Sequence, residues 1–166
     1  MKFSEFKYER PNFDQYKATM TSLIDQFKVA SSASEQLNIV TEINETRNHI
    51  ETMATLASIR HSIDTRDEFY DAEQNYWDEY GPLYEEINSL FYDAVVSSPY
   101  RNELEEKLSK QFFTILDYRL KAFSPEIIAD LQEENKLSSQ YTKLLASAKI
   151  PFDGEERTYL EWGNIY

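Results

Sequence analysis

Hydrophobic positions recur every three or four residues along most of this chain, which is the period of an α-helix with one buried face. The first such run follows Asn12, a residue type that favours the position just before a helix. Its apolar members are Phe13, Tyr16, Met20, Leu23, Ile24 and Phe27. We therefore expect a first helix over about residues 13–27, with these side chains on one face.

A second helix is predicted to begin after Ser32, because Ser32 and Glu35 have the spacing of a capping box. Its apolar positions are Val40, Ile43, Ile50, Met53, Ala54, Ala57 and Ile63. Arg47 and His61 fall on or beside the same line. Polar groups are therefore expected within a buried seam.

The third predicted helix is the most aromatic segment, and Thr65 with Glu68 forms a candidate capping box at its start. One apolar line contains Phe69, Tyr76, Tyr80, Leu83, Ile87, Leu90 and Ala94, while Tyr70, Trp77, Tyr84 and Phe91 repeat every seven residues beside it. Gly81-Pro82 interrupts the run, yet the period keeps its phase across this pair. We predict one kinked helix, from about Arg66 to Ser97, in the middle of the fold.

Two further helices are predicted after Ser98-Pro99 and Ser124-Pro125, because serine followed by proline is a strong helix-start signal. The fourth helix has apolar positions at Leu104, Leu108, Phe112, Ile115, Leu116 and Leu120. The fifth has them at Ile127, Ile128, Leu131, Tyr141, Leu144, Leu145 and Ala148. Each helix is expected to bury one face. The period then changes to two at Ile150 and Phe152, before Asp153-Gly154, which suits a hairpin turn.

The predicted fold is an all-α bundle of about five helices, several of them long and antiparallel, with a short C-terminal β-hairpin. We expect residues 1–148 to form a helical domain and residues 149–166 to form the hairpin and a truncated connection.

Composition narrows the possible functions. The 166 residues include no cysteine, which removes thiolate chemistry and fits a reducing cytoplasm. A formal net charge of −13 disfavours nucleic acid and anionic membranes as partners. No apolar run reaches the roughly 18 residues of a membrane span.

Histidine chemistry has only His49 and His61 available. Glu45 and His49 lie one turn apart and could supply two metal ligands, but a complete site needs more donors. His61 lies near a helix end, where Asp64 could accept its proton, and we expect it to have a structural role. No site residue is therefore predicted to be catalytic, cofactor-binding or metal-binding.

Two structural hypotheses concern the third helix. Arg47 is expected to pair with a buried carboxylate such as Glu73, because buried charges require partners. The aromatic arc from Phe69 to Tyr92 is expected to fill a core, with a surface for a partner as the alternative.

Three stretches of the sequence resemble the beginning of oligoendopeptidase F, a member of the thimet-oligopeptidase-like zinc peptidases. They are Phe6 to Pro11 (FKYERP), Met53 to Pro82 (MATLASIRHSIDTRDEFYDAEQNYWDEYGP) and Phe123 to Thr158 (FSPEIIADLQEENKLSSQYTKLLASAKIPFDGEERT).

The resemblance implies an N-terminal helical lobe that forms part of the wall of a channel for oligopeptide substrates. In that family the zinc is held by an HExxH motif and a further glutamate in a C-terminal catalytic region. This sequence has no HExxH, so no cofactor is expected in this chain, and zinc is expected in a full-length parent.

Family members are much longer than 166 residues, which suggests that this chain is a fragment whose catalytic region is missing. Surface meant to meet that region would then be exposed, and the helix from Arg66 onward is our candidate for self-association. The alternative function is a helical protein-interaction module whose aromatic arc docks a partner helix, with no enzymatic role.

Overall fold

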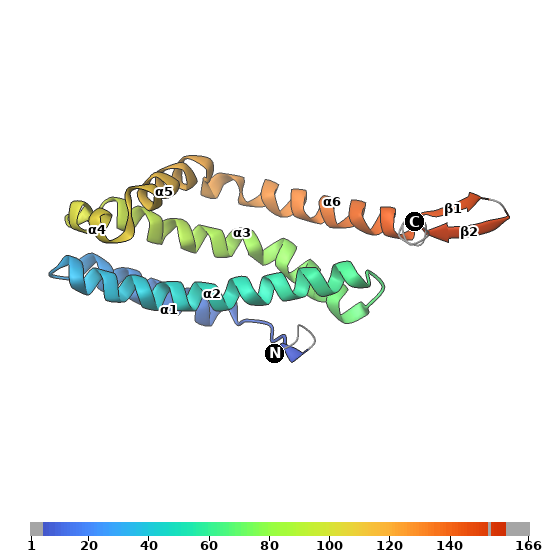
Figure 1. Cartoon of the computed structure of the whole chain (residues 1–166), viewed down its shortest axis with the longest axis horizontal. Helices are drawn as coiled ribbons and strands as arrows, with labels where there is room; N and C mark the ends of the chain where they lie inside the picture. The colour runs from blue at the N-terminus through green and yellow to red at the C-terminus, as the bar shows by residue number, and fades with distance from the viewer. Residues whose placement is uncertain (1–4, 153, 159–166) are drawn as a thin grey trace.

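The computed structural model describes residues 5–152 and 154–158 and shows a bundle of long helices with a hairpin at its C-terminal end (Figure 1). The helices are α1 (Phe13–Val29), α2 (Ala33–Ile63), α3 (Glu68–Val96), α4 (Arg101–Leu108), α5 (Lys110–Ala122) and α6 (Ile128–Ser147), with a short 3₁₀ helix, η2 (Pro125–Ile127), before α6. The strands β1 (Lys149–Phe152) and β2 (Glu155–Thr158) pair antiparallel. The predicted all-α bundle with a terminal hairpin is confirmed. None of the helices in the described ranges is long and apolar enough to span a membrane.

The hairpin of α1 and α2 begins as the sequence indicates. The Asn12 side chain accepts a hydrogen bond from the Gln15 amide (2.9 Å), and the Ser32 side chain accepts one from the Glu35 amide (3.2 Å). These bonds satisfy backbone donors that have no partner inside the helix. The buried residues of α1 are Tyr16, Met20, Leu23, Ile24 and Phe27, so the first predicted stripe faces the core.

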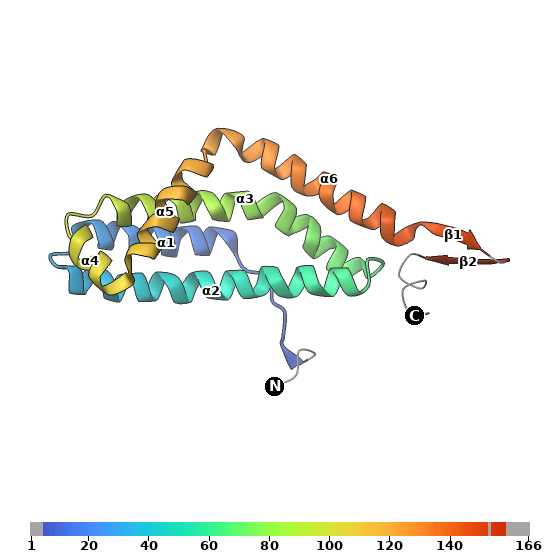
Figure 2. The ribbon, with the colours of Figure 1, turned by 45° about the horizontal axis from the view of Figure 1, so that its top comes forward.

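Helix α3 is one continuous helix through Pro82, as predicted, and Figure 2 shows its axis bending along its length. It is capped by Asp67 rather than by the predicted Thr65, because the Asp67 carboxylate accepts hydrogen bonds from the amides of Phe69 and Tyr70. A carboxylate at this position also favours the positive end of the helix dipole.

Side chains of α6 donate hydrogen bonds to α3 at its kink. Pro82 has no backbone N–H, so the carbonyl of Asp78, four residues earlier, loses its helical donor. Asn135 of α6 donates its side-chain amide to this oxygen (3.3 Å), and Gln132 donates to the carbonyl of Glu79 (2.7 Å). The Asn135 amide therefore replaces the hydrogen bond that Asp78 loses inside α3, and the Gln132 amide adds a second bond to the next carbonyl.

The fourth predicted helix is two helices in the structure, and this part of the prediction is wrong. Ser109 has a φ of 87°, a left-handed conformation that ends α4, and its side chain then accepts a hydrogen bond from the Phe112 amide to begin α5. Helix α4 also starts later than predicted, at Arg101. The Ser98 hydroxyl is buried and donates to Gln36 of α2 (2.6 Å), which ties the turn to the bundle.

The predicted buried face of the fifth helix is also wrong for Tyr141, Leu144 and Leu145, which are exposed, whereas Ile128 and Leu131 are partly buried. Helix α6 has no buried residue, and η2 intervenes between Ser124 and its first turn, with no capping bond from the Ser124 side chain. In both Figure 1 and Figure 2, α6 lies along α3 on the side away from α1 and α2. The core is therefore built mainly by α1, α2, α3, α4 and α5, and α6 lies at the edge of the bundle.

Candidate functional site

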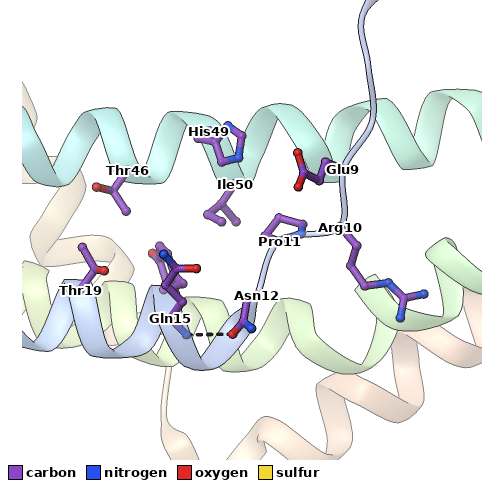
Figure 3. Close-up of a pocket in the computed structure, with 10 residues that line it drawn as sticks. Glu9, Arg10, Pro11, Asn12, Gln15, Thr19, Thr46, His49 and Ile50 are labelled. Atoms are coloured by element: carbon purple, nitrogen blue, oxygen red, sulfur yellow. Dashed lines mark hydrogen bonds between the residues drawn. The ribbon is translucent and has the colours of Figure 1, made fainter.

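A polar cleft of about 360 Å³ lies where the segment before α1 crosses between α1 and α2 (Figure 3). Figure 3 shows Thr46 of α2 and Thr19 of α1 on opposite sides of it, with Pro11 between the two helices. The residues that line the cleft are Glu9, Arg10, Pro11, Asn12, Gln15, Tyr16, Thr19, Thr46, His49 and Ile50. Carboxylate, imidazole, amide and hydroxyl groups meet here, so the cleft offers both donors and acceptors to a polar ligand.

The candidate metal ligands Glu45 and His49 are both exposed on α2, and His49 lines this cleft. His61 is 12 positions further along the same helix, about 18 Å away at 1.5 Å per residue. Within residues 5–152 and 154–158, three or more His, Asp or Glu side chains never gather closely enough to hold a metal ion. The described residues therefore do not fit the zinc site that the resemblance implies.

Arg10 at the edge of the cleft is held by the buried carboxylate of Glu73. Two guanidinium nitrogens donate to the two carboxylate oxygens of Glu73, at 2.6 and 2.9 Å, and the Tyr8 hydroxyl also donates to Glu73. The indole of Trp77 donates to the Tyr8 hydroxyl (3.2 Å), and the Arg10 guanidinium lies 4.8 Å from the centre of the Tyr76 ring. This cluster fixes the segment before α1 against the first half of α3.

The cluster determines the ionisation of Glu73. Burial by itself raises the pKa of Glu73, but the hydrogen bonds from Arg10 and Tyr8 outweigh burial, so the pKa lies below its ordinary value near 4.5. For Tyr8, burial and the hydrogen bond to Glu73 together raise the pKa of the phenol. The pair is therefore charged carboxylate and neutral phenol at neutral pH.

The lowered pKa of Glu73 predicts that part of the free energy of unfolding depends on pH in the acid range. Because the folded pKa of Glu73 is depressed, the unfolded state binds more protons as the pH falls below about 4.5, and the stabilisation is lost as the pH drops through the folded pKa. The free energy of unfolding should therefore decrease less between about pH 5 and pH 3 in Glu73→Gln than in the original chain. Urea titrations at several pH values would measure both slopes.

Glu106→Gln, at an exposed position of α4, is the control for that experiment. A Glu73→Gln chain with the same pH slope as the control would contradict the assignment.

The predicted pair between Arg47 and Glu73 is wrong. Arg47 donates to the Tyr92 hydroxyl (2.6 Å), lies 5.1 Å from the centre of the Tyr92 ring, and forms a looser ion pair with Glu51 (3.5 Å). Because α2 and α3 run antiparallel, Arg47 lies beside the second half of α3, whereas Glu73 lies near its start. The buried carboxylate of Glu73 is paired with Arg10 instead.

His61 is buried, with only 4% of its surface exposed, and its Nε2 lies 3.4 Å from Asp71 of α3 rather than near Asp64. Asp64 instead pairs with Arg66 (3.3 Å). Lys143 of α6 also forms an ion pair with Asp71, and its hydrogen bond is the main cause that lowers the pKa of Asp71. His61 therefore belongs to a contact among α2, α3 and α6.

The aromatic arc of α3 mostly fills the core, in agreement with the preferred hypothesis. Trp77, Tyr84 and Phe91 are buried, while Phe69 remains 55% exposed at the start of the helix. Tyr84 makes edge contacts with Phe13 and Tyr16 of the neighbouring segment, with ring centres 5.1 and 4.8 Å apart. Most of the large rings of the arc are therefore packed inside the bundle.

Two sets of structural contacts had no clear signal in the sequence. Tyr8 and Arg10 come before the first helical period, so nothing in the pattern placed them against Glu73. The amides of Gln132 and Asn135 are ordinary polar positions until α6 is placed beside the kink at Pro82. Only the general rule that a proline frees a carbonyl could have prompted a search for such donors.

The comparisons with known proteins agree with one another. The family described as "Peptidase M3 N-terminal domain" matches residues 3–123. A solved structure described as PZ peptidase A with an inhibitor is 52% identical, with a TM-score of 0.92 over 95% of this chain and 28% of its own. A second, described as an oligoendopeptidase F, is 51% identical, with a TM-score of 0.92, and covers 95% of this chain and 28% of its own.

A third solved structure, an oligoendopeptidase F from Bacillus anthracis str. Ames, is 47% identical, with a TM-score of 0.92 over 95% of this chain and 29% of its own. Among curated proteins none matches. The chain thus spans less than a third of the length of these solved relatives.

Proposed function

Because this chain belongs to the Peptidase M3 N-terminal domain family, we propose that it acts as the N-terminal helical lobe of a zinc-dependent oligoendopeptidase that hydrolyses short peptides. The lobe forms part of the wall of the substrate channel and contributes no catalytic or metal-binding residue. The observation that supports this most strongly is the likeness to peptidase structures at 47–52% identity, with a TM-score of 0.92 over 95% of this chain.

The division of labour follows from the donors present. In metal-assisted hydrolysis the ion polarises the scissile carbonyl and activates water, which requires a compact set of ligands with an open position. We expect the zinc to be held by another part of the longer protein, in agreement with the lack of such a set among the described residues. What this chain supplies is a rigid wall that limits access to short peptides, and a cleft whose polar groups can bind a peptide backbone.

The proposed function also assigns roles to two parts of the chain. We propose that residues 1–148 form the lobe and that residues 149–166 lead toward the catalytic region; residues 159–166 lie outside the described part of the chain. A cysteine-free composition suits a cytoplasmic enzyme.

The interaction module is the weaker candidate. Its motivating feature was an exposed aromatic arc, and Trp77, Tyr84 and Phe91 of that arc are packed inside the bundle.

A chimera tests the proposal. This chain would replace the corresponding N-terminal 28% of PZ peptidase A, and cleavage of short peptides and of a folded protein would be measured with the zinc-loaded chimera. We expect cleavage of the short peptides, loss of that cleavage on chelation, and no cleavage of the folded protein. The chain alone should neither cleave peptides nor bind stoichiometric zinc. A folded, zinc-loaded chimera that cleaves no short peptide would refute the proposed function.

A further inference from the structure

Helix α6 has the reverse of the usual amphipathic arrangement over most of its length. Its partly buried positions, which face α3, include the polar residues Gln132, Asn135, Ser139 and Lys143. The large apolar residues from Leu137 onward point the other way, and we call them the outer face of α6: Leu137 (55% exposed), Tyr141 (62%), Leu144 (66%) and Leu145 (49%). At 100° per residue, Leu137, Tyr141 and Leu144 fall within a narrow stripe opposite Ser139.

Specific polar contacts hold α6 in this orientation. Gln132 and Asn135 donate to the carbonyls at the α3 kink, and Lys143, on the same side of α6, pairs with Asp71 of α3. Rotating α6 to bury its leucines against α3 would break all three contacts and leave the Asp78 carbonyl, which has no helical donor, without a partner. The outward direction of the leucines is therefore built into the packing of α6 on α3.

Nothing in the described part of the chain covers the outer face, since α1 and α2 lie beyond α3 in both views (Figures 1 and 2). Four adjacent large apolar side chains exposed on one helix are typical of a surface that contacts another protein segment. The identity of that segment is the remaining question.

The comparisons indicate what covers this face. The family match ends at residue 123, just before α6, whereas the likeness to solved structures covers 95% of the chain, with a TM-score of 0.92. In PZ peptidase A the matching region is only 28% of the chain, so most of that protein is additional. Helix α6 thus lies between the region that matches the family and a much larger remainder.

We propose that the outer face of α6 is the docking surface for the catalytic region of a longer M3 peptidase chain, an inference that rests on the proposed function. Docking there buries the leucines that α3 leaves exposed, while the contacts at the α3 kink and at Asp71 set the angle at which α6 presents them. A second copy of this chain is a poorer occupant, because a net charge of −13 on each copy opposes their approach.

The absence of cysteine in this chain makes a direct test possible. Leu144→Cys would be introduced into the 166-residue chain and into the chimera with PZ peptidase A, and its rate of reaction with a thiol reagent would be followed by mass spectrometry of the peptide that contains residue 144. We expect the reaction to be at least about tenfold slower in the chimera, because the thiol is covered there. Val29→Cys, at an 82% exposed position of α1, is the matched control and should react rapidly in both proteins.

Equal rates for Leu144→Cys in the two proteins would overturn the proposal. The reaction rate of Leu144→Cys in the 166-residue chain could instead fall as the protein concentration rises, with no further decrease in the chimera. That result would also overturn the proposal and assign the outer face of α6 to a second copy of the chain. Protection is scored separately from peptide cleavage: a protected thiol in a chimera without peptidase activity would support docking while refuting the proposed function.

Discussion

Replacing Phe91 by alanine is expected to lower the free energy of unfolding by about 3–5 kcal/mol, more than any other substitution that we propose. The Phe91 side chain is fully buried in the second half of α3 and makes an edge contact with Phe27 of α1, with ring centres 6.5 Å apart. Truncation removes apolar surface from the core and leaves a cavity that three helices cannot close without moving.

Urea unfolding followed by circular dichroism would measure this loss. Leu90→Ala is the matched control, because Leu90 is the preceding residue of the same helix but is 54% exposed. We expect it to change stability by less than about 1 kcal/mol. Similar losses for the two variants would show that α3 does not face the core as the structure has it.

Replacing Arg10 by methionine is expected to cost about 2 kcal/mol, the second largest effect. The change leaves the buried Glu73 carboxylate without its cation, and only the hydrogen bond from Tyr8 remains. The full cost of an unpaired buried charge is reduced here, because the Arg10 side chain is 48% exposed and water can approach the site.

A second substitution separates the pair from simple packing. Glu73→Leu in the Arg10→Met background removes the orphaned charge and should restore most of the lost stability, since an apolar pair can replace a buried ion pair. Arg66→Met, where the side chain is 91% exposed, is the control and should have little effect. An Arg10→Met chain as stable as this control would contradict the role given to the pair.

Some of the fold could be predicted because it depends on short stretches of sequence. The stripe from Tyr16 to Phe27 and the caps at Asn12 and Ser32 each involve residues within a few turns of one another. The continuity of α3 through Pro82 could also be predicted, because the apolar period keeps its phase on both sides of the proline. The resemblance to peptidases could be recognised because it depends on contiguous stretches of sequence.

The errors concern residues whose partners are distant in sequence. The break at Ser109 depends on how α5 packs on α3, since no glycine marks the left-handed position. Arg47 donates to Tyr92 and does not pair with Glu73, because the register of the antiparallel helices α2 and α3 decides which residues lie opposite each other. The cleft that contains His49 likewise exists only where the segment before α1 crosses α2.

The sequence by itself determined the helical class, the starts of α1 and α2, the terminal hairpin and the family to which the chain belongs. These properties depend on local periodicity, on capping and on residue identity. The tertiary structure decided that α6 turns its leucines outward, because the Asp78 carbonyl freed by Pro82 and the neighbouring Glu79 carbonyl, both on α3, accept hydrogen bonds from its side-chain amides. A hydrophobic pattern shows that a helix has an apolar face, but only the neighbouring backbone determines the direction in which that face points.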